Sequence, residues 1–90
     1  MGLTTDRKEQ LIKEYGLSGT DTGSAIVQIA LLSERIQQVT EHLNKHRKDF
    51  SSQRGLRKMV GQRRRHLKYL KRRNLAAYKE LIQRLGIRGV

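Results

Sequence analysis

A histidine, an aspartate and a serine lie close together in the middle of the chain, amid lysines and arginines. His42, Asp49 and Ser52 are the three residue types of a hydrolase triad. A triad also needs an oxyanion hole in a pocket that excludes water, and the chain has no Gly-x-Ser-x-Gly elbow. His42, His46 and Asp49 do not form a closed set of metal ligands. The sequence therefore predicts no catalysis, no metal and no cofactor.

The same three side chains are suited to reading RNA. The minor groove of an A-form helix exposes 2′-hydroxyls and the guanine amino group, and a carboxylate accepts a hydrogen bond from such a donor. Ser52 and His42 can each donate to, or accept from, a hydroxyl or a base edge. Capping of the next helix explains Asp49 equally well, so base readout and capping both stay open for it.

The net charge of +12 is concentrated in one half of the chain. Residues 1–45 carry five Lys or Arg against six Asp or Glu, whereas residues 46–90 carry fifteen against two. Such an excess predicts a polyanionic partner. Nucleic acid is favoured over a membrane because no basic stretch is paired with an aromatic, lipid-seeking face. An RNA or DNA chaperone and a helical adaptor for an acidic protein remain as alternatives.

The cations of "RKMVGQRRRHLKYLKRR" are predicted to share one side of a helix. At about 100° per residue they fall within an arc of about 140°; its members are Arg54, Arg57, Lys58, Arg64, Arg65, Lys68, Lys71 and Arg72. An adjacent arc of about 100° is apolar and consists of Leu56, Met59, Val60, Leu67 and Leu70. Arg63 falls within the apolar arc and is unexplained. Like charges without neighbouring acids repel one another, which favours a bound anion over a merely solvated surface.

Two further polar features are candidate contacts. Gln28, Arg35 and His42 are seven residues apart and form a line beside the apolar seam of one long helix. Thr22 and Gly23 lie at the predicted start of that helix, where free N–H groups favour a phosphate and a missing Cβ lets a backbone come close. Helix capping and solvent exposure are the plainer explanations of these two features.

The elements that position these residues are all predicted to be helices. Proline is absent, and no stretch alternates as a strand does. We expect one all-α domain over residues 1–90 with four helices. The second helix is defined by the apolar residues Ala25, Ile29, Leu32, Ile36, Val39 and Leu43, and the third by the apolar arc from Leu56 to Leu70. The fourth helix is defined by Leu75, Tyr78, Leu81, Ile82 and Leu85. The first spans about 4–15 and ends at Gly16, and the last ends at Gly86. A polar bend, "KHRKDFSSQRG", is expected to join the two long helices as an antiparallel hairpin on which the short helices pack.

Cysteine is absent, which is compatible with a reducing compartment, and no apolar run approaches the length of a membrane span. The N-terminal "MGLTTDRKEQ" resembles neither a signal nor a transit peptide. We therefore expect a protein of the cytoplasm or of the interior of an organelle of bacterial descent.

Four stretches, "GTDTGSAIVQIALL", "EHLNKHRKDFSSQRGL", "MVGQRRRHLKYLKRRN" and "LIQRLGIRG", together resemble the bacterial-type small-subunit ribosomal protein number fifteen over nearly the whole chain. The resemblance implies a three-helix bundle with a mobile N-terminal helix, monomeric when free. It also implies binding to 16S rRNA at a three-way junction, nucleation of the 30S platform beside other platform proteins, and an intersubunit bridge to 23S rRNA. It leaves open whether the chain binds its own messenger RNA.

The resemblance also assigns roles to residues. The junction contacts would be Thr22, Gly23, Gln28, Arg35, Arg65, Tyr69 and Arg72. The minor-groove contacts would be His42, Asp49 and Ser52. Among the remaining cations we expect phosphate contacts from Arg54, Arg57, Arg64, Lys68 and Lys71, named here the phosphate face. Many members carry histidines directly after the bend aspartate, where this chain has Phe50 and Ser51.

Overall fold

The computed structural model describes residues 4–15 and 21–90, and for residues 21–23 the backbone only. The four helices are α1 (Thr5–Tyr15), α2 (Asp21–Lys45), α3 (Phe50–Arg73) and α4 (Leu75–Leu85). Within these ranges there is no β-strand. The predicted all-α fold is therefore confirmed. Gly16, the predicted end of the first helix, lies outside the described residues.

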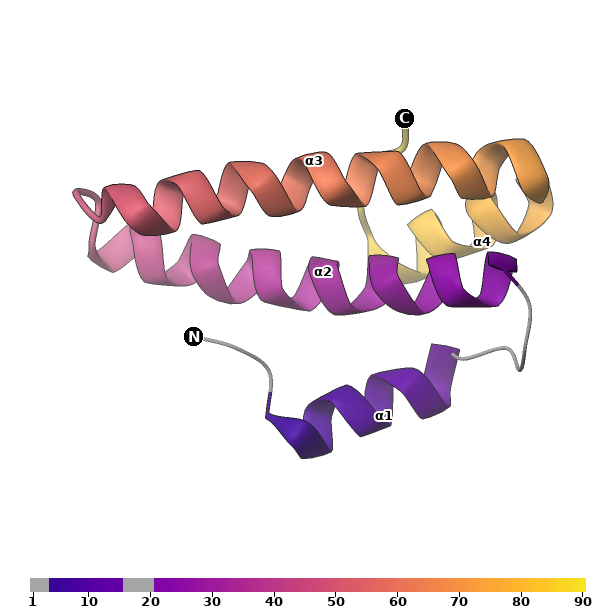
Figure 1. The fold of residues 1–90 in the computed structure, drawn as a ribbon, viewed down its shortest axis with the longest axis horizontal. Coiled ribbons are helices and arrows are strands. Elements are labelled where there is room, and N and C mark those ends of the chain that lie inside the picture. The colour runs from indigo at the N-terminus through magenta and orange to yellow at the C-terminus, as the bar shows by residue number, and fades with distance from the viewer. Residues whose placement is uncertain (1–3, 16–20) are drawn as a thin grey trace.

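The two long helices form the antiparallel hairpin that the sequence predicts (Figure 1). The bend between them is shorter than predicted, because residues 50–55 already belong to α3. The cause is a side-chain cap: one carboxylate oxygen of Asp49 accepts from the backbone N–H of Ser52 at 3.1 Å. A capped first turn satisfies an orphan N–H, so the helix begins inside a stretch whose polar composition is typical of a loop.

A single asparagine separates α3 from α4. The backbone N–H of Asn74 donates to the Leu70 carbonyl at 2.7 Å, and its side-chain oxygen accepts from the Ala77 N–H at 3.1 Å. The same residue therefore ends one helix and caps the next. α4 turns back and packs against α3 and the beginning of α2 (Figure 1). It ends at Gly86, which has φ 63° and ψ 35°, the left-handed conformation that glycine adopts without strain.

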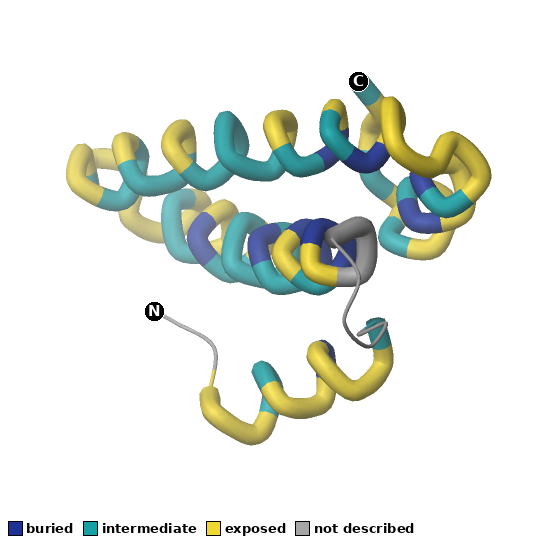
Figure 2. The backbone as a smooth tube through the Cα atoms, turned by 45° about the vertical axis from the view of Figure 1, so that its right-hand side comes forward, coloured by how far each residue is buried: buried dark blue, intermediate teal, exposed yellow. Residues whose placement is uncertain are grey.

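The core lies where α2, α3 and α4 meet, and its buried residues are Ile26, Ile29, Leu67, Leu70, Tyr78 and Leu81. Figure 2 shows buried positions gathered at this end of the hairpin, with the bend end more exposed. The predicted seam of α2 is confirmed at Ala25, Ile29, Leu32 and Val39. Leu75 was wrongly placed in the α4 apolar set, since it is 48% exposed. It begins the helix and lies about 70° from the centre of the buried arc.

The first helix packs on α2, on the side away from α3 (Figure 1). Leu11 is buried there. Arg7 forms a bidentate pair with Glu34, with Nε–Oε1 and Nη2–Oε2 distances of 2.6 and 2.8 Å. Arg84 of α4 bonds Glu14 at 3.1 Å and lies over the Tyr15 ring. Three side-chain contacts thus hold α1 in this position, and the mobility implied by the resemblance stays a prediction.

Candidate nucleic-acid interface

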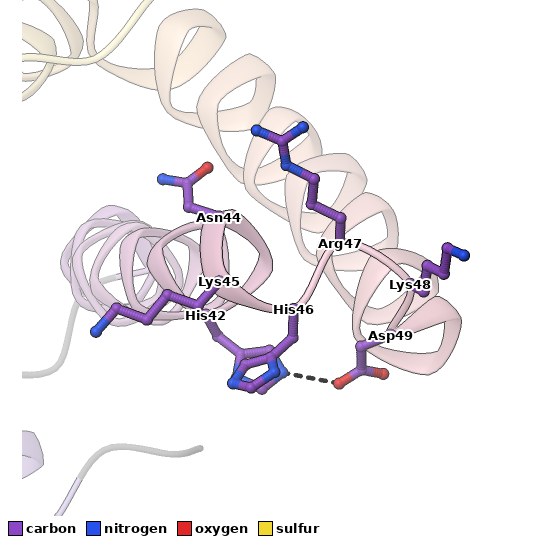
Figure 3. Close-up of a pocket in the computed structure, with 7 residues that line it drawn as sticks. All are labelled: His42, Asn44, Lys45, His46, Arg47, Lys48 and Asp49. Atoms are coloured by element: carbon purple, nitrogen blue, oxygen red, sulfur yellow. Dashed lines mark hydrogen bonds and ion pairs between the residues drawn. The ribbon is translucent and has the colours of Figure 1, made fainter.

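The structure brings His42, Asp49 and Ser52 together at the bend end of the hairpin. His42 near the end of α2 lies with Nε2 2.8 Å from Oδ2 of Asp49 (Figure 3). The Ser52 hydroxyl donates to the same Oδ2 at 2.7 Å, while the Ser52 backbone N–H donates to Oδ1. The carboxylate is thus the centre of the cluster, and it joins the last turn of α2 to the first turn of α3.

This bonding order is not that of a hydrolase. In a triad the serine contacts the histidine, which removes its proton, and the acid orients the histidine from the far side. Here Ser52 and His42 both bond to Asp49, and no hydrogen bond joins Ser52 to His42 among the contacts of the described residues. The Ser52 hydroxyl therefore bonds to the carboxylate and not to the imidazole that a triad requires. The hollow beside the cluster is open to solvent and lined by Asn44, Lys45, His46, Arg47 and Lys48 with His42 and Asp49 (Figure 3).

The protonation state of Asp49 determines what the cluster presents to a ligand. Hydrogen bonds from Ser52 and then from His42 lower the Asp49 pKa from 3.8 to about 2, so at neutral pH the carboxylate only accepts. The Ser52 hydrogen therefore points at Asp49, leaving the lone pairs of Oγ available. A neutral His42 must carry its hydrogen on Nε2, which leaves Nδ1 as an acceptor. Asp49 thus orients both neighbours, so that the Ser52 oxygen and, when the ring is neutral, His42 Nδ1 are left to accept.

Asp49 itself has little capacity left for a base. A carboxylate offers about four acceptor sites, and three are used by His42 and Ser52. The sequence left capping and base readout open for this residue, and capping is now observed. His46, which no sequence prediction placed in a site, stacks on the His42 ring with centroids 4.7 Å apart. This contact restricts the orientation of the His42 ring.

The predicted cationic side of α3 is exposed in the structure. All eight of its side chains are exposed: Arg54, Arg57, Lys58, Arg64, Arg65, Lys68, Lys71 and Arg72. In the described part of the chain none of them pairs with a carboxylate; the ion pairs found involve Arg7, His42 and Arg84. Unpaired cations on one face leave a strong local potential for an anion. Lys71 already has a hydrogen-bond partner, because its Nζ donates to the Val90 carbonyl at 2.8 Å.

Arg63, unexplained from the sequence, has a structural role between the long helices. Its Nη1 lies 3.3 Å from the Ser33 hydroxyl of α2. Burial lowers the pKa of the Arg63 guanidinium. The long side chain covers apolar surface while its head bonds across the hairpin. Arg63 is therefore part of the packing, which separates it from the exposed cations on either side of it in the sequence.

The predicted junction residues lie at the other end of the hairpin. Arg65, Tyr69 and Arg72 are spaced by four and three residues on the C-terminal half of α3, so they share one narrow arc. Core contacts of Ile26 and Ile29 with Leu67 and Leu70 place this half of α3 beside the beginning of α2. Arg73, absent from the sequence prediction, lies 5.3 Å from the centre of the Tyr69 ring. It had no signal in the sequence beyond its charge.

The remaining junction candidates come from α2. Gln28 is exposed and Arg35 is partly buried, and both lie along the helix between its start and the bend. Thr22 and Gly23 are in the first turn of α2, as predicted, but their side chains lie outside the described residues. At a rise of about 1.5 Å per residue, Thr22 is about 30 Å from His42. The predicted junction set therefore runs from the start of α2 along the helix, and its members Thr22 and Gly23 lie at the end of the hairpin opposite to the Asp49 cluster.

Neither a membrane helix nor a metal cluster was found in the part of the chain that the structure describes. None of its helices combines the length and apolarity needed to cross a bilayer. Within residues 4–15 and 21–90, no three His, Cys, Asp or Glu side chains are grouped to hold a metal ion. These are findings about the described residues only.

A comparison with known protein families identifies the family of this helical chain with its cationic face. The profile of the family described as ribosomal protein S15 matches residues 8–88, which covers all four helices except the first residues of α1. The matched segment includes both predicted RNA-binding ends of the hairpin and the whole of α3. The family consists of structural ribosomal proteins rather than enzymes. The chain belongs to the ribosomal protein S15 family, and is accordingly a ribosomal protein that binds ribosomal RNA.

Proposed function

We propose that this protein binds the 16S rRNA of the small subunit and bridges two RNA elements, a three-way junction and an adjoining helix. The observation that carries the proposal is the separation of the two polar surfaces. The arc of Arg65, Tyr69 and Arg72 lies at the α4 end of the hairpin, and the cluster around Asp49 lies at the bend end. Two packed helices with a shared core are a stiff spacer between the two contacts.

The junction end supplies charge and one aromatic ring. Arg65 and Arg72 are exposed and flank Tyr69 on α3, and Thr22 and Gly23 begin the neighbouring helix. Guanidinium groups can bond phosphates in bidentate fashion, and the free N–H groups of a helix start can donate to a further phosphate. A junction brings several phosphate backbones close together, so a concentrated cationic end favours it over a single duplex.

The bend end supplies acceptors for a minor groove. Ser52 Oγ and, in its neutral form, His42 Nδ1 can accept from a 2′-hydroxyl or from the guanine amino group, which is the one base donor in that groove. Both atoms are held in place by Asp49. Fixed acceptors recognise a G·C or G·U pair and disfavour an A·U pair, which lacks the amino group. The contact therefore adds sequence preference to the phosphate contacts of α3.

Early binding across a junction fixes the relative orientation of the RNA helices, and on this basis the protein nucleates platform assembly together with neighbouring small-subunit proteins. An intersubunit bridge to 23S rRNA and binding to its own messenger RNA belong to the same proposal, without residues assigned to them. Both would use exposed basic surface that the 16S contacts leave free. The protein would act on the ribosome, in the cytoplasm or in an organelle of bacterial descent.

The test is a mobility-shift titration on two RNAs of equal length and charge, a three-way junction with an adjoining G·C-rich helix and an uninterrupted duplex. We expect binding to the junction to be at least tenfold tighter at one fixed salt concentration, because only the junction engages both ends of the hairpin. Equal affinity for the two RNAs would instead indicate a sequence-tolerant RNA chaperone. Replacing Arg65 and Arg72 by Gln should remove the preference, whereas replacing Lys79 and Arg88, two exposed cations outside both sites, should not.

A further inference from the structure

Phe50 is an exposed aromatic residue at the start of α3. It is the only phenylalanine of the chain, and its exposed fraction is 62%. Phe50 does not belong to the core cluster, and the cap that starts the helix is made by Asp49 and Ser52. Neither the core nor the cap requires an aromatic ring at this position. The exposed ring is therefore available to contact a ligand.

The three tyrosine rings of the chain already have cationic partners. Arg84 lies 4.5 Å from the centre of the Tyr15 ring, Arg73 lies 5.3 Å from that of Tyr69, and Lys71 lies 5.6 Å from that of Tyr78. Tyr78 is also buried. Among the Phe and Tyr rings that the structure describes, Phe50 is thus the one without a cation over its face, so its face is open to another flat group.

Phe50 lies on the phosphate face of α3. It precedes Arg54 by four residues and Arg57 by seven, so all three fall on one side of the helix, in line with Arg64 further along. Each of these side chains is exposed. At about 1.5 Å per residue the ring lies about 6 Å along the helix from Arg54. Ser52, in contrast, is turned by about 160° from Phe50 around α3, toward α2.

We propose that Phe50 is a stacking site for an unpaired RNA base, next to phosphates held by Arg54 and Arg57. The inference rests on the phosphate face binding RNA, as in the proposed function, and adds a base contact on a side of α3 that does not carry the Asp49 cluster. An aromatic ring at the end of a row of cations is the arrangement with which proteins bind single strands, because every base has a face to stack on. An apolar protein partner fits less well, since it would have to desolvate the neighbouring guanidinium groups.

The chain has no tryptophan, so one substitution creates a specific reporter. Phe50→Trp places a single indole at the proposed site, and Ile12→Trp places one at another exposed apolar position, on α1 and outside both proposed RNA sites. The probe is a single-stranded RNA of twelve nucleotides and mixed sequence, with a blunt duplex of the same length for comparison. We expect the single strand to quench the emission of Phe50→Trp in a saturable manner. The duplex, whose bases are already stacked, should quench it weakly, and Ile12→Trp should respond little to either.

Affinity and salt dependence separate stacking from charge. Phe50→Leu retains an apolar side chain but has no flat ring, and it should bind the single strand about 5- to 150-fold more weakly. Its dependence of log K on log salt should equal that of the unmodified protein, because no charge is lost. Arg54→Gln should instead reduce that slope by about 0.7. Circular dichroism checks that both variants keep their helices.

An unchanged affinity of Phe50→Leu for the single strand, or unchanged emission of Phe50→Trp, would overturn the stacking proposal and leave the ring for a protein partner. These results do not depend on the junction experiment. A protein that fails to prefer the three-way junction would refute the proposed function, and the single-strand data would still decide the role of Phe50.

Discussion

Asp49→Asn separates the helix cap from the alignment of Ser52 and His42. Asn caps helices about as well as Asp, so its side-chain oxygen can keep the bond to the Ser52 N–H. The amide nitrogen that replaces Oδ2 cannot accept from the Ser52 hydroxyl or from His42 Nε2, as the carboxylate does now. The amide would donate to Ser52, whose own hydrogen would then turn outward. One acceptor becomes a donor, and His42 loses the partner that fixes its tautomer.

The expected loss of RNA affinity follows from the number of base contacts that the substitution removes. Losing a matched base-edge contact corresponds to a factor of about 5 to 150 in affinity. We therefore expect Asp49→Asn to weaken binding to the junction RNA with its G·C-rich helix by a factor in this range. Binding to a duplex of A·U pairs should stay equal or become tighter, since one negative charge has been removed from a basic region.

The assay is a paired titration of both proteins on both RNAs at one salt concentration. Glu80→Gln is the matched control, because it removes the only other acidic charge of residues 46–90 at an exposed position on α4. Ser52→Ala should reproduce the loss on the junction RNA while the backbone N–H keeps its bond to Asp49. Helicity measured by circular dichroism should not change. If Asp49→Asn binds the junction RNA as tightly as Glu80→Gln does, Asp49 is only a cap and the minor-groove site must be rejected.

Three further results are expected. The pKa of Asp49 is lowered from 3.8 to about 2 in the folded protein. Its contribution to stability is therefore complete above pH 3.8 and disappears as the pH falls toward 2. Between pH 5 and pH 2, the thermal unfolding temperature should fall more steeply for the unmodified protein than for Asp49→Asn. Leu70→Ala removes a side chain with 0% exposure from the meeting point of three helices. It should lower the free energy of unfolding, measured by urea titration, by about 2–5 kcal/mol. Ile12→Ala, at an exposed site, should change that free energy little. Replacing Arg65 and Arg72 by Gln should reduce the slope of log K against log salt on a junction RNA by about 1.4–1.8, and a slope unaffected by their loss would show that they do not touch phosphates.

Much of the fold could be predicted because helical periodicity and capping are local signals. The seam from Ala25 to Val39 and the stop at Gly86 follow from residue spacing and from the conformational freedom of glycine. Leu75 shows the limit of spacing, since an apolar residue at the first position of a helix is not covered by its own preceding turn. The bend length was wrong for a similar reason, because a polar composition does not reveal that Asp49 and Ser52 already form a helix cap.

The candidate site was predictable in composition but not in bonding. Sequence proximity and the hairpin brought His42, Asp49 and Ser52 to one end. The sequence could not show that two donors share one carboxylate oxygen. That arrangement decides between a catalytic and a binding role. The stacking of His46 on His42 and of Arg73 on Tyr69 depends on rotamers set by packing, so neither has a signature in the sequence.

The most direct test of the central claim is a cleavage experiment from the two ends of the hairpin. The chain has no cysteine, so Ser51→Cys at the bend end and Ala76→Cys at the α4 end each give one attachment point for an iron chelate that generates hydroxyl radicals. Both positions are exposed, so folding and RNA binding should be preserved. We predict that the Ala76 position cleaves 16S rRNA strands at a three-way junction and that the Ser51 position cleaves a separate set of nucleotides in an adjoining helix. Cleavage of the same nucleotides from both positions, or of none from Ser51, would contradict the proposal that this hairpin bridges two RNA elements.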